Sequence, residues 1–128
     1  MVGIDIVEVK RIVEGNAGGK IEDRILSDKE KEYLHRKSKN LVKGREFSEY
    51  DNSLAGFWAA KEAVLKSFGI GLHSINLKDI QILHKETGEP YVKLIGSALE
   101  KMGKDATKNA KISISHDAGL AISICFLN

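Results

Sequence analysis

Phe57 to Gly69 read Phe-Trp-Ala-Ala-Lys-Glu-Ala-Val-Leu-Lys-Ser-Phe-Gly, and this stretch is the strongest helix signal in the sequence. Its Ala, Leu, Lys and Glu residues favour helix, and Gly69 and Gly71 supply a stop. At about 100° per residue, one apolar stripe is formed by Leu54, Phe57, Trp58, Leu65 and Phe68. Lys61 falls inside that stripe, so one charge interrupts the apolar side of the expected helix.

Glu62 and Lys66 are four residues apart on this helix, at the edge of the apolar stripe. One interpretation is an exposed ion pair that contributes about 0.3 to 0.5 kcal/mol, with Lys61 reaching out of the core edge to water. The other is that Glu62 binds a hard cation and both lysines bind phosphate, since such groups along one cleft suit a metal-bound polyphosphate. A second carboxylate with no local reason for its position would favour the second interpretation.

The composition is that of an ordinary single globular domain. The chain has 128 residues, of which 42% are hydrophobic and 30% are charged. Its net charge of +2 is too small to indicate a nucleic-acid partner. The single cysteine, Cys125, excludes an intramolecular disulfide, and the apolar run around it predicts a buried side chain. The sequence contains neither a membrane-spanning apolar run nor a signal-peptide pattern, so we expect a cytoplasmic protein.

Residues 1–9 read Met-Val-Gly-Ile-Asp-Ile-Val-Glu-Val, a β-branched run that predicts a largely buried strand. Alternation places Val2, Ile4 and Ile6 on one face and Gly3, Asp5 and Val7 on the other. Asp5 therefore projects from a strand with isoleucine on both sides. A buried carboxylate is costly unless it is hydrogen-bonded, paired or bound to a cation. Asp5 either bonds to nearby backbone at a strand end or is a functional anion.

Helical patterns follow this strand. A short helix is expected up to Gly15, and residues 21–26 carry a second apolar face. Ser27 and Glu30 form a capping box, with Ser at the N-cap and Glu at N3, which opens a helix that runs to about Lys37.

Residues 38–53 are polar with few apolar anchors, and we expect a mobile loop or a frayed helical excursion there. Asp51, Asn52 and Ser53 each suit the N-cap of the central helix that follows, and the residues alone do not choose between them.

After residue 71 the sequence predicts two β-hairpins and one short helix. They are strands 80–84 and 91–94 around a turn at 85–90, a helix at 97–102, and strands 111–115 and 120–126 around a turn at 116–119. His116 lies where the last hairpin turns, next to Ser115. A histidine in that position binds a phosphate or holds the tip of the turn, and both interpretations stay open.

Three stretches match one enzyme family in order along the chain. They are residues 3–8 (Gly-Ile-Asp-Ile-Val-Glu), residues 58–66 (Trp-Ala-Ala-Lys-Glu-Ala-Val-Leu-Lys) and residues 113–116 (Ser-Ile-Ser-His). Together they resemble the holo-acyl-carrier-protein synthases, the small phosphopantetheinyl transferases of fatty-acid synthesis. The blocks run from near the N-terminus to near the C-terminus, so the resemblance covers essentially the whole chain.

The resemblance implies transfer of 4'-phosphopantetheine from coenzyme A to a serine of apo acyl carrier protein, with release of adenosine 3',5'-bisphosphate. By position it implies Asp5 and Glu62 as Mg2+ ligands, Glu62 or Asp5 as the base, and Lys66 as the cation for the leaving oxygens. It also implies that Lys61 positions Glu62 or a phosphate. The implied coenzyme A contacts are Lys61, Lys66, Ser67, Gly69, Gly71, Pro90, Ser115 and His116. The implied carrier-protein contacts are the basic residues Arg11, Lys20 and Arg24.

We expect one α+β domain over residues 1–128, with an antiparallel sheet packed on the long central helix. The resemblance further implies a homotrimer with active sites between subunits, where Asp5 and Glu62 of one chain meet His116 of another, or the reverse. Two features depart from the family pattern. Phe57 stands where relatives commonly carry Arg, so one expected phosphate contact is either missing or supplied by another residue such as Arg45. Residues 38–53 also form a longer segment than usual.

A non-catalytic module is the alternative hypothesis. In that case a basic face formed by Lys10, Arg11, Lys20 and Arg24 would bind RNA or another polyanion. Most aromatic residues lie in apolar patterns and offer no stacking platform for bases, which counts against this hypothesis. We therefore expect coenzyme A and acyl carrier protein as partners, and neither nucleic acid nor a membrane.

Overall fold

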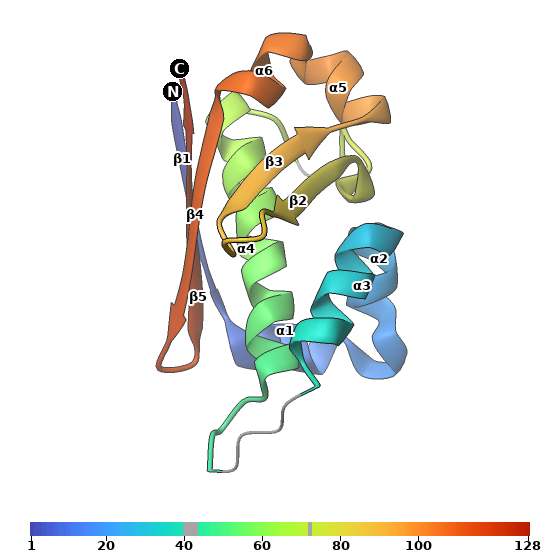
Figure 1. Cartoon of the computed structure of the whole chain (residues 1–128), viewed down its shortest axis with the longest axis vertical. Coiled ribbons are helices and arrows are strands. Elements are labelled where there is room, and N and C mark those ends of the chain that lie inside the picture. The colour runs from blue at the N-terminus through green and yellow to red at the C-terminus, as the bar shows by residue number, and fades with distance from the viewer. Residues whose placement is uncertain (40–43, 72) are drawn as a thin grey trace.

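A computed structural model describes residues 1–39, 44–71 and 73–128 of the chain (Figure 1). Part of the loop predicted over residues 38–53, namely residues 40–43, lies outside the described ranges. The helices are α1 (Val9–Gly15), α2 (Lys20–Ile25), α3 (Asp28–Lys37), α4 (Glu49–Phe68), α5 (Gly96–Met102) and α6 (Lys104–Asn109), with short 3-10 turns η1 (Ala17–Gly19) and η2 (Leu77–Asp79). The strands are β1 (Val2–Glu8), β2 (Ile80–His84), β3 (Pro90–Leu94), β4 (Ala110–Asp117) and β5 (Leu120–Leu127).

The central helix α4 is 20 residues long and starts earlier than predicted. Its N-cap is Ser48, whose hydroxyl accepts a hydrogen bond from the backbone N–H of Asp51, while the Asp51 carboxylate accepts one from the Ser48 N–H. The predicted caps Asp51, Asn52 and Ser53 are therefore wrong, because this reciprocal pair satisfies two free N–H groups one turn upstream. The predicted end is confirmed, since Gly69 adopts the left-handed conformation at the C-cap.

An antiparallel sheet with strand order β1-β5-β4 packs against one side of α4 (Figure 1). The contact between β1 and α4 is close enough to require glycine. A methyl group on Gly3 would overlap the carbonyl oxygen of Ala63 and lie 2.5 Å from the amide nitrogen of Ser67. Glycine thus lets the strand lie directly on the helix backbone, which brings Asp5, two residues further on the same face, to the helix.

The face of this sheet that points away from α4 is apolar over β1 and β5 and largely exposed in the single chain, while β4 contributes polar side chains to it. Seven residues form the apolar part, which we call the outer face: Val2, Ile4, Ile6, Leu120, Ile122, Ile124 and Phe126. Ile6 is 59% exposed and Phe126 is 50% exposed. The prediction of a largely buried first strand is therefore wrong for one of its two faces, because only the face toward α4 is covered within the chain.

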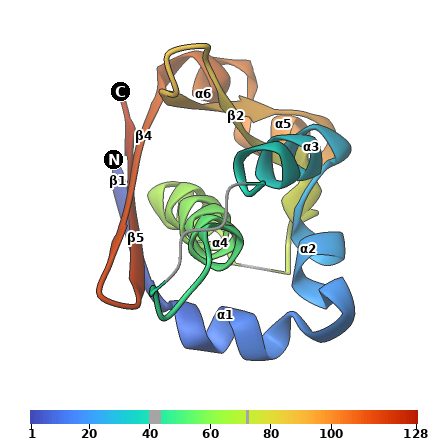
Figure 2. The same cartoon turned by 60° about the horizontal axis from the view of Figure 1, so that its bottom comes forward.

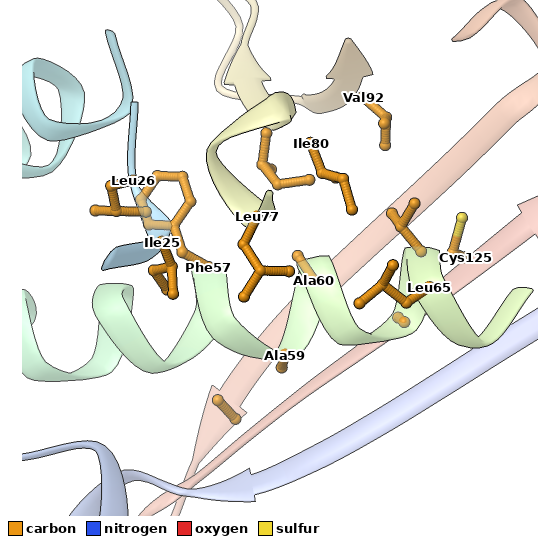
Figure 3. Close-up of a cluster of buried hydrophobic side chains, with 14 of the residues drawn as sticks. Ile25, Leu26, Phe57, Ala59, Ala60, Leu65, Leu77, Ile80, Val92 and Cys125 are labelled. Atoms are coloured by element: carbon orange, nitrogen blue, oxygen red, sulfur yellow. The ribbon is translucent and has the colours of Figure 1, made fainter. Parts of the chain in front are cut away.

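The β2–β3 hairpin, α3, α5 and α6 lie on the other sides of α4 (Figure 2). Figure 3 shows the apolar side chains that gather along α4 from these elements, with Cys125 from the sheet fully buried among them as predicted. The capping box at Ser27 and Glu30 is confirmed, as are both hairpins and the helix near residues 97–102. Helix α6 was not predicted. Within the described ranges, no helix is long and apolar enough to cross a membrane.

Candidate active site

Asp5 lies on the face of β1 that points toward α4, and it meets one lysine of that helix. Its Oδ1 accepts a hydrogen bond from Lys66 Nζ at 2.9 Å, and the same ammonium donates to the carbonyl oxygen of Ile4 at 3.1 Å. Its Oδ2 is buried and has no hydrogen-bond partner among the residues described. Lys66 therefore neutralises part of the charge on Asp5, while one carboxylate oxygen stays free to bind something else.

Glu62 lies one turn before Lys66 and lines the same cavity as Asp5. That cavity, which we call the acidic cavity, has a volume of about 330 Å³ and is also bordered by Arg11 and Trp58. Glu62 Oε1 is buried and, within the described part of the chain, has no hydrogen-bond partner. Burial raises the pKa of the Glu62 carboxyl, the nearby Asp5 charge raises it further, and Lys66 opposes both. Two acids far apart in sequence thus converge, and Lys66 pairs with Asp5, which contradicts the interpretation of Glu62 and Lys66 as an exposed pair.

The two free oxygens, Asp5 Oδ2 and Glu62 Oε1, fit a divalent cation with oxygen ligands. Mg2+ typically takes one or two protein carboxylates and completes its shell with water and substrate phosphates. In residues 1–39, 44–71 and 73–128 no group of three or more His, Cys, Asp or Glu side chains forms a ready-made metal cage. The donor set is therefore of the open kind that suits a phosphate-bound Mg2+ rather than a closed structural site.

The raised pKa of Glu62 gives a stability prediction for metal-free protein. Because the folded state holds this proton more tightly than the unfolded chain, the stabilising contribution is complete below the ordinary pKa of 4.5 and is lost as the pH rises through the raised value. At pH 8 in EDTA, Glu62→Gln is expected to raise the Tm by about 2 to 5 °C. The gain should vanish near pH 4. Thermal unfolding by circular dichroism measures both, and a lower Tm for the variant at pH 8 would contradict the prediction.

Lys61 is buried, as its place in the apolar stripe required, but two of its predicted roles, reaching water and contacting a phosphate of coenzyme A, are wrong. Its side chain is 1% exposed, and the ammonium donates to Glu30 Oε1 and to the carbonyl oxygens of Ile25 and Leu77. Burial lowers the pKa of Lys61, and the Glu30 carboxylate opposes that shift. With three acceptors for its three protons, Lys61 neither reaches water nor contacts a phosphate.

The three small residues expected to contact coenzyme A at the end of α4 separate into two groups. Ser67 is buried: its hydroxyl donates to the carbonyl oxygen of Val64 at 2.6 Å, and β1 covers its amide. The prediction of Ser67 as a coenzyme A contact is therefore wrong, because the residue faces the sheet. Gly69 and Gly71 are exposed, just beyond Lys66, and their backbone is open to approach.

A second cavity, with a volume of about 180 Å³, lies between α4, the β2–β3 hairpin and β4. Pro90 and His116 both line it, so the structure brings these two predicted residues together. Ser115 points to the opposite face of the sheet, where it pairs with Ile122. His116 and Asp117 belong to β4, so the predicted four-residue turn is shorter, with Ala118 and Gly119 at its tip.

One wall of this second cavity consists of three aromatic rings. His84 stacks on Tyr33, with ring centroids 3.9 Å apart and planes 2° apart, and both rings meet Phe57 edge-on. Burial, with a smaller contribution from the Lys37 charge, lowers the pKa of His84 to about 4, so its imidazole is neutral at physiological pH. Phe57, which replaces the arginine expected from the resemblance, is buried in this wall.

A third cavity of about 520 Å³ adjoins the second, since both are lined by Asn52 and His116. Arg45 lines the third cavity. Arg45 was suggested as a replacement for the arginine that Phe57 displaces, and it lines the same cavity as His116.

The two sides of the site lie at opposite edges of the sheet. Asp5 is on β1 at one edge, and His116 is on β4 at the other, with β5 between them. In Figure 2, α1 lies on one side of α4 and the β2–β3 hairpin on the other. Within one chain, therefore, the acidic cavity and the cavity at Pro90 are separate.

One of the three candidate carrier-protein contacts borders the acidic cavity. Arg11, on α1, borders it. Lys20 and Arg24, on α2, are exposed.

Sequence reasoning missed the roles of several residues, among them Glu30 and Trp58. Glu30 was predicted only as a helix cap, since nothing local signals its contact with Lys61, 31 positions away. Trp58 was placed in the apolar stripe, and its role as a wall of the acidic cavity follows only from how β1 and α1 cover the helix.

Comparison with known proteins agrees with this geometry. Residues 1–125 match the family model of the 4'-phosphopantetheinyl transferase superfamily. A holo-[acyl-carrier-protein] synthase of Clostridium kluyveri is 40% identical over 127 residues, covering 98% of this chain and 87% of that protein. One of Campylobacter hominis is 36% identical over 130 residues, covering 99% and 96%.

Solved structures agree as well. The holo-[acyl-carrier-protein] synthase of Helicobacter pylori in complex with coenzyme A has a TM-score of 0.76 and 28% identity, with both chains covered completely. That of Bacillus anthracis, in complex with CoA (3',5'-ADP), has a TM-score of 0.76 and 28% identity, covering 98% of this chain and 93% of that one. The chain therefore belongs to the 4'-phosphopantetheinyl transferase superfamily, as an enzyme of the holo-[acyl-carrier-protein] synthase family.

Proposed function

We propose that residues 1–128 act as one transferase domain that moves 4'-phosphopantetheine from coenzyme A to a serine of apo acyl carrier protein. The reaction depends on Mg2+ and serves fatty-acid biosynthesis in the cytoplasm. The observation that carries the proposal is the pair of free carboxylate oxygens on Asp5 and Glu62, beside Lys66, in a chain that matches the family from residue 1 to 125.

The chemistry assigns a role to each of these side chains. The serine oxygen attacks the pyrophosphate phosphorus that carries the pantetheine arm; a new O–P bond forms, the bridging P–O bond breaks, and adenosine 3',5'-bisphosphate leaves with the bonding electrons. Glu62 takes the serine proton directly or through a bound water, since its carboxylate lines the cavity in which the reaction is proposed to occur. Lys66, with 52% of its side chain exposed, neutralises charge on the leaving oxygens.

Mg2+ bound by Asp5 and Glu62 would neutralise the charge of the coenzyme A pyrophosphate. Pro90, His116 and Arg45 bind the nucleotide end, because a proline ring packs on a flat base while histidine and arginine bind phosphate.

The active site is proposed to form between subunits of a homotrimer. Two observations support this. The acidic cavity and the cavity lined by Pro90 and His116 lie at opposite edges of one sheet, and the outer face is apolar and exposed. Assembly through the outer face covers these side chains and brings the β1 edge of one chain to the β4 edge of the next. Ser115, on the outer face side of β4, then lies at the subunit boundary.

The carrier protein docks on the basic residues Arg11, Lys20 and Arg24. Arg11 borders the acidic cavity, so a carrier held there delivers its serine close to Glu62. Complementary charge of this kind chiefly speeds encounter and sets orientation.

The proposal is tested by the mass of the carrier protein. Apo acyl carrier protein incubated with the purified enzyme, coenzyme A and Mg2+ is expected to gain one phosphopantetheine, and EDTA should prevent the gain. Intact-protein mass spectrometry measures the product, with a reaction that lacks enzyme as the control. An unchanged carrier mass, together with salt-sensitive RNA binding, would overturn the proposal in favour of a polyanion-binding module.

A further inference from the structure

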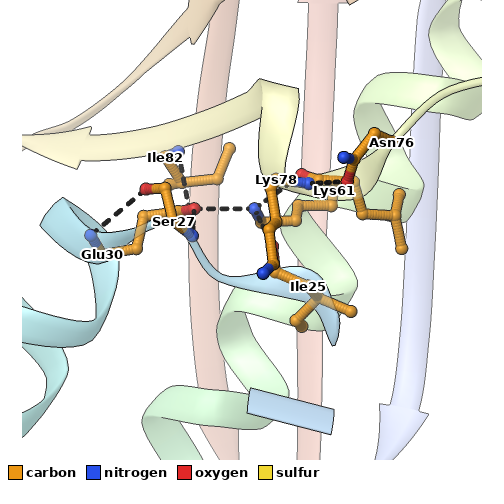
Figure 4. A network of polar contacts seen from close by, with 8 residues as sticks. Ile25, Ser27, Glu30, Lys61, Asn76, Lys78 and Ile82 are labelled. Atoms are coloured by element: carbon orange, nitrogen blue, oxygen red, sulfur yellow. Dashed lines mark hydrogen bonds and ion pairs between the residues drawn. The ribbon is translucent and has the colours of Figure 1, made fainter. Parts of the chain in front are cut away.

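Glu30 and Lys61 form a buried ion pair with all of its polar atoms occupied (Figure 4). Lys61 Nζ donates to Glu30 Oε1 at 2.8 Å and to two backbone carbonyl oxygens, of Ile25 at 2.6 Å and Leu77 at 2.8 Å. Glu30 Oε1 also accepts from the N–H of Ser27, and its Oε2 accepts from the N–H of Ile82. Glu30 is 0% exposed and Lys61 is 1% exposed.

These hydrogen bonds join four segments to one residue of α4: the end of α2, the start of α3, the turn η2 and the strand β2. Ile25 ends α2, the helix that carries Lys20 and Arg24. Ile82 lies in β2, which pairs with β3 and thereby holds Pro90. Lys61 itself precedes Glu62. The pair therefore connects the three surfaces that the proposed function assigns to the carrier protein, the nucleotide and the metal.

Apolar and polar contacts both set the rotation of α4. Its buried side carries four large apolar residues and four alanines: Leu54, Phe57, Val64, Leu65, Ala55, Ala59, Ala60 and Ala63. Burial of apolar surface is non-directional, so the alanines in this set add little control over the rotation. Hydrogen bonds are directional, and three of them hold the Lys61 ammonium. Because successive residues on a helix point about 100° apart, holding Lys61 also sets the direction of Glu62.

Resting on the proposed function, we infer that Glu30 and Lys61 are a positioning pair for the reaction. They touch neither substrate nor metal; they hold α4 in the rotation that points Glu62 at Asp5. Buried ion pairs are retained for such specificity in some proteins, although they add little stability compared with apolar replacements.

Lys61→Met tests the inference through Mg2+ binding. The single tryptophan, Trp58, lines the cavity of Asp5 and Glu62, so its fluorescence reports binding there without catalysis. In a titration with Mg2+ at saturating coenzyme A, the variant is expected to need about tenfold more Mg2+ for half-saturation, the usual loss when a residue behind a metal ligand is removed. Its turnover at saturating Mg2+ should fall as well.

Matched variants separate positioning from stability. Leu54→Ala removes a fully buried side chain of α4 and should lower the Tm while leaving the Mg2+ half-saturation point within twofold of wild type. The double variant Glu30→Gln with Lys61→Met removes the buried charge that the single variant leaves unpaired; it should regain part of the lost Tm but keep the raised Mg2+ requirement.

The inference is overturned if folded Lys61→Met binds Mg2+ like wild type, or if Leu54→Ala weakens binding equally. Failure of the wild-type protein to transfer phosphopantetheine would instead overturn the proposed function. If Lys61→Met does not fold, the double variant alone decides, since an unchanged half-saturation point in it excludes positioning.

Discussion

Glu62→Gln is expected to reduce phosphopantetheine transfer by about a thousandfold or more, which corresponds to about 4 kcal/mol of lost transition-state stabilisation. The substitution removes a proposed Mg2+ ligand and the proposed base while keeping the size of the side chain. Asp5→Asn should cause a comparable loss of the transfer rate. It should also increase the Mg2+ requirement more than Glu62→Gln does, because it weakens the ion pair with Lys66 and so leaves the ammonium charge less neutralised beside the cation. Steady-state rates measured from carrier-protein mass give the size of both effects.

A matched control is Glu100→Gln, since Glu100 is an exposed acid on α5, away from both cavities. It should keep the wild-type rate within twofold. The dependence of kcat on pH separates the two carboxylates, because only the variant that lacks the base should lose the acidic limb of the profile. If both Asp5→Asn and Glu62→Gln turn over like wild type, the assignment of the metal centre is wrong.

If the enzyme assembles as the homotrimer proposed above, mixed trimers of two inactive variants are expected to regain activity. Asp5→Asn damages the acidic edge, and His116→Ala damages the nucleotide edge, so each pure variant should be nearly inactive. A trimer that contains both chains has one site, among its three, with both edges native, which predicts about a third of the wild-type rate. Co-expression with two affinity tags and sequential purification yields such trimers, and their rate is compared with that of tagged wild type.

The contradicting outcome is a mixed assembly with no regained activity. If one chain supplies the whole active site, mixing gives only the residual rates of the two variants. A control mixture of Asp5→Asn with Glu62→Gln should also stay inactive under the composite arrangement, because both changes damage the same edge. Sedimentation equilibrium of the mixtures confirms that assembly itself is intact.

Local sequence patterns predicted much of the fold and one half of the site. The helix around Lys61, its stop at Gly69, the capping box at Ser27, both hairpins and the two faces of β1 follow from periodicity and capping chemistry, which act over a few residues. Helix α6 was not predicted because its six residues, Lys-Asp-Ala-Thr-Lys-Asn, show little apolar periodicity. The start of α4 was not predicted correctly because several consecutive polar residues suit an N-cap equally well.

The partners of the charged residues depended on tertiary structure. Lys61 and Lys66 lie five positions apart on one helix and have the same chemistry, yet Lys61 binds Glu30 in the core and Lys66 binds Asp5 at the cavity edge. Those partners are 31 and 61 positions away, beyond the range of any local pattern.

The sequence by itself determined most of the elements, their apolar faces and, through three motifs, the two acids of the site, since these depend on side-chain types and spacing within a few turns. Only the tertiary structure decided that Ser67 is sealed against β1, that Ser115 and His116 point to opposite faces, and that the two cavities lie at opposite sheet edges. The physical reason is that exposure and pairing are set by which distant segments pack together.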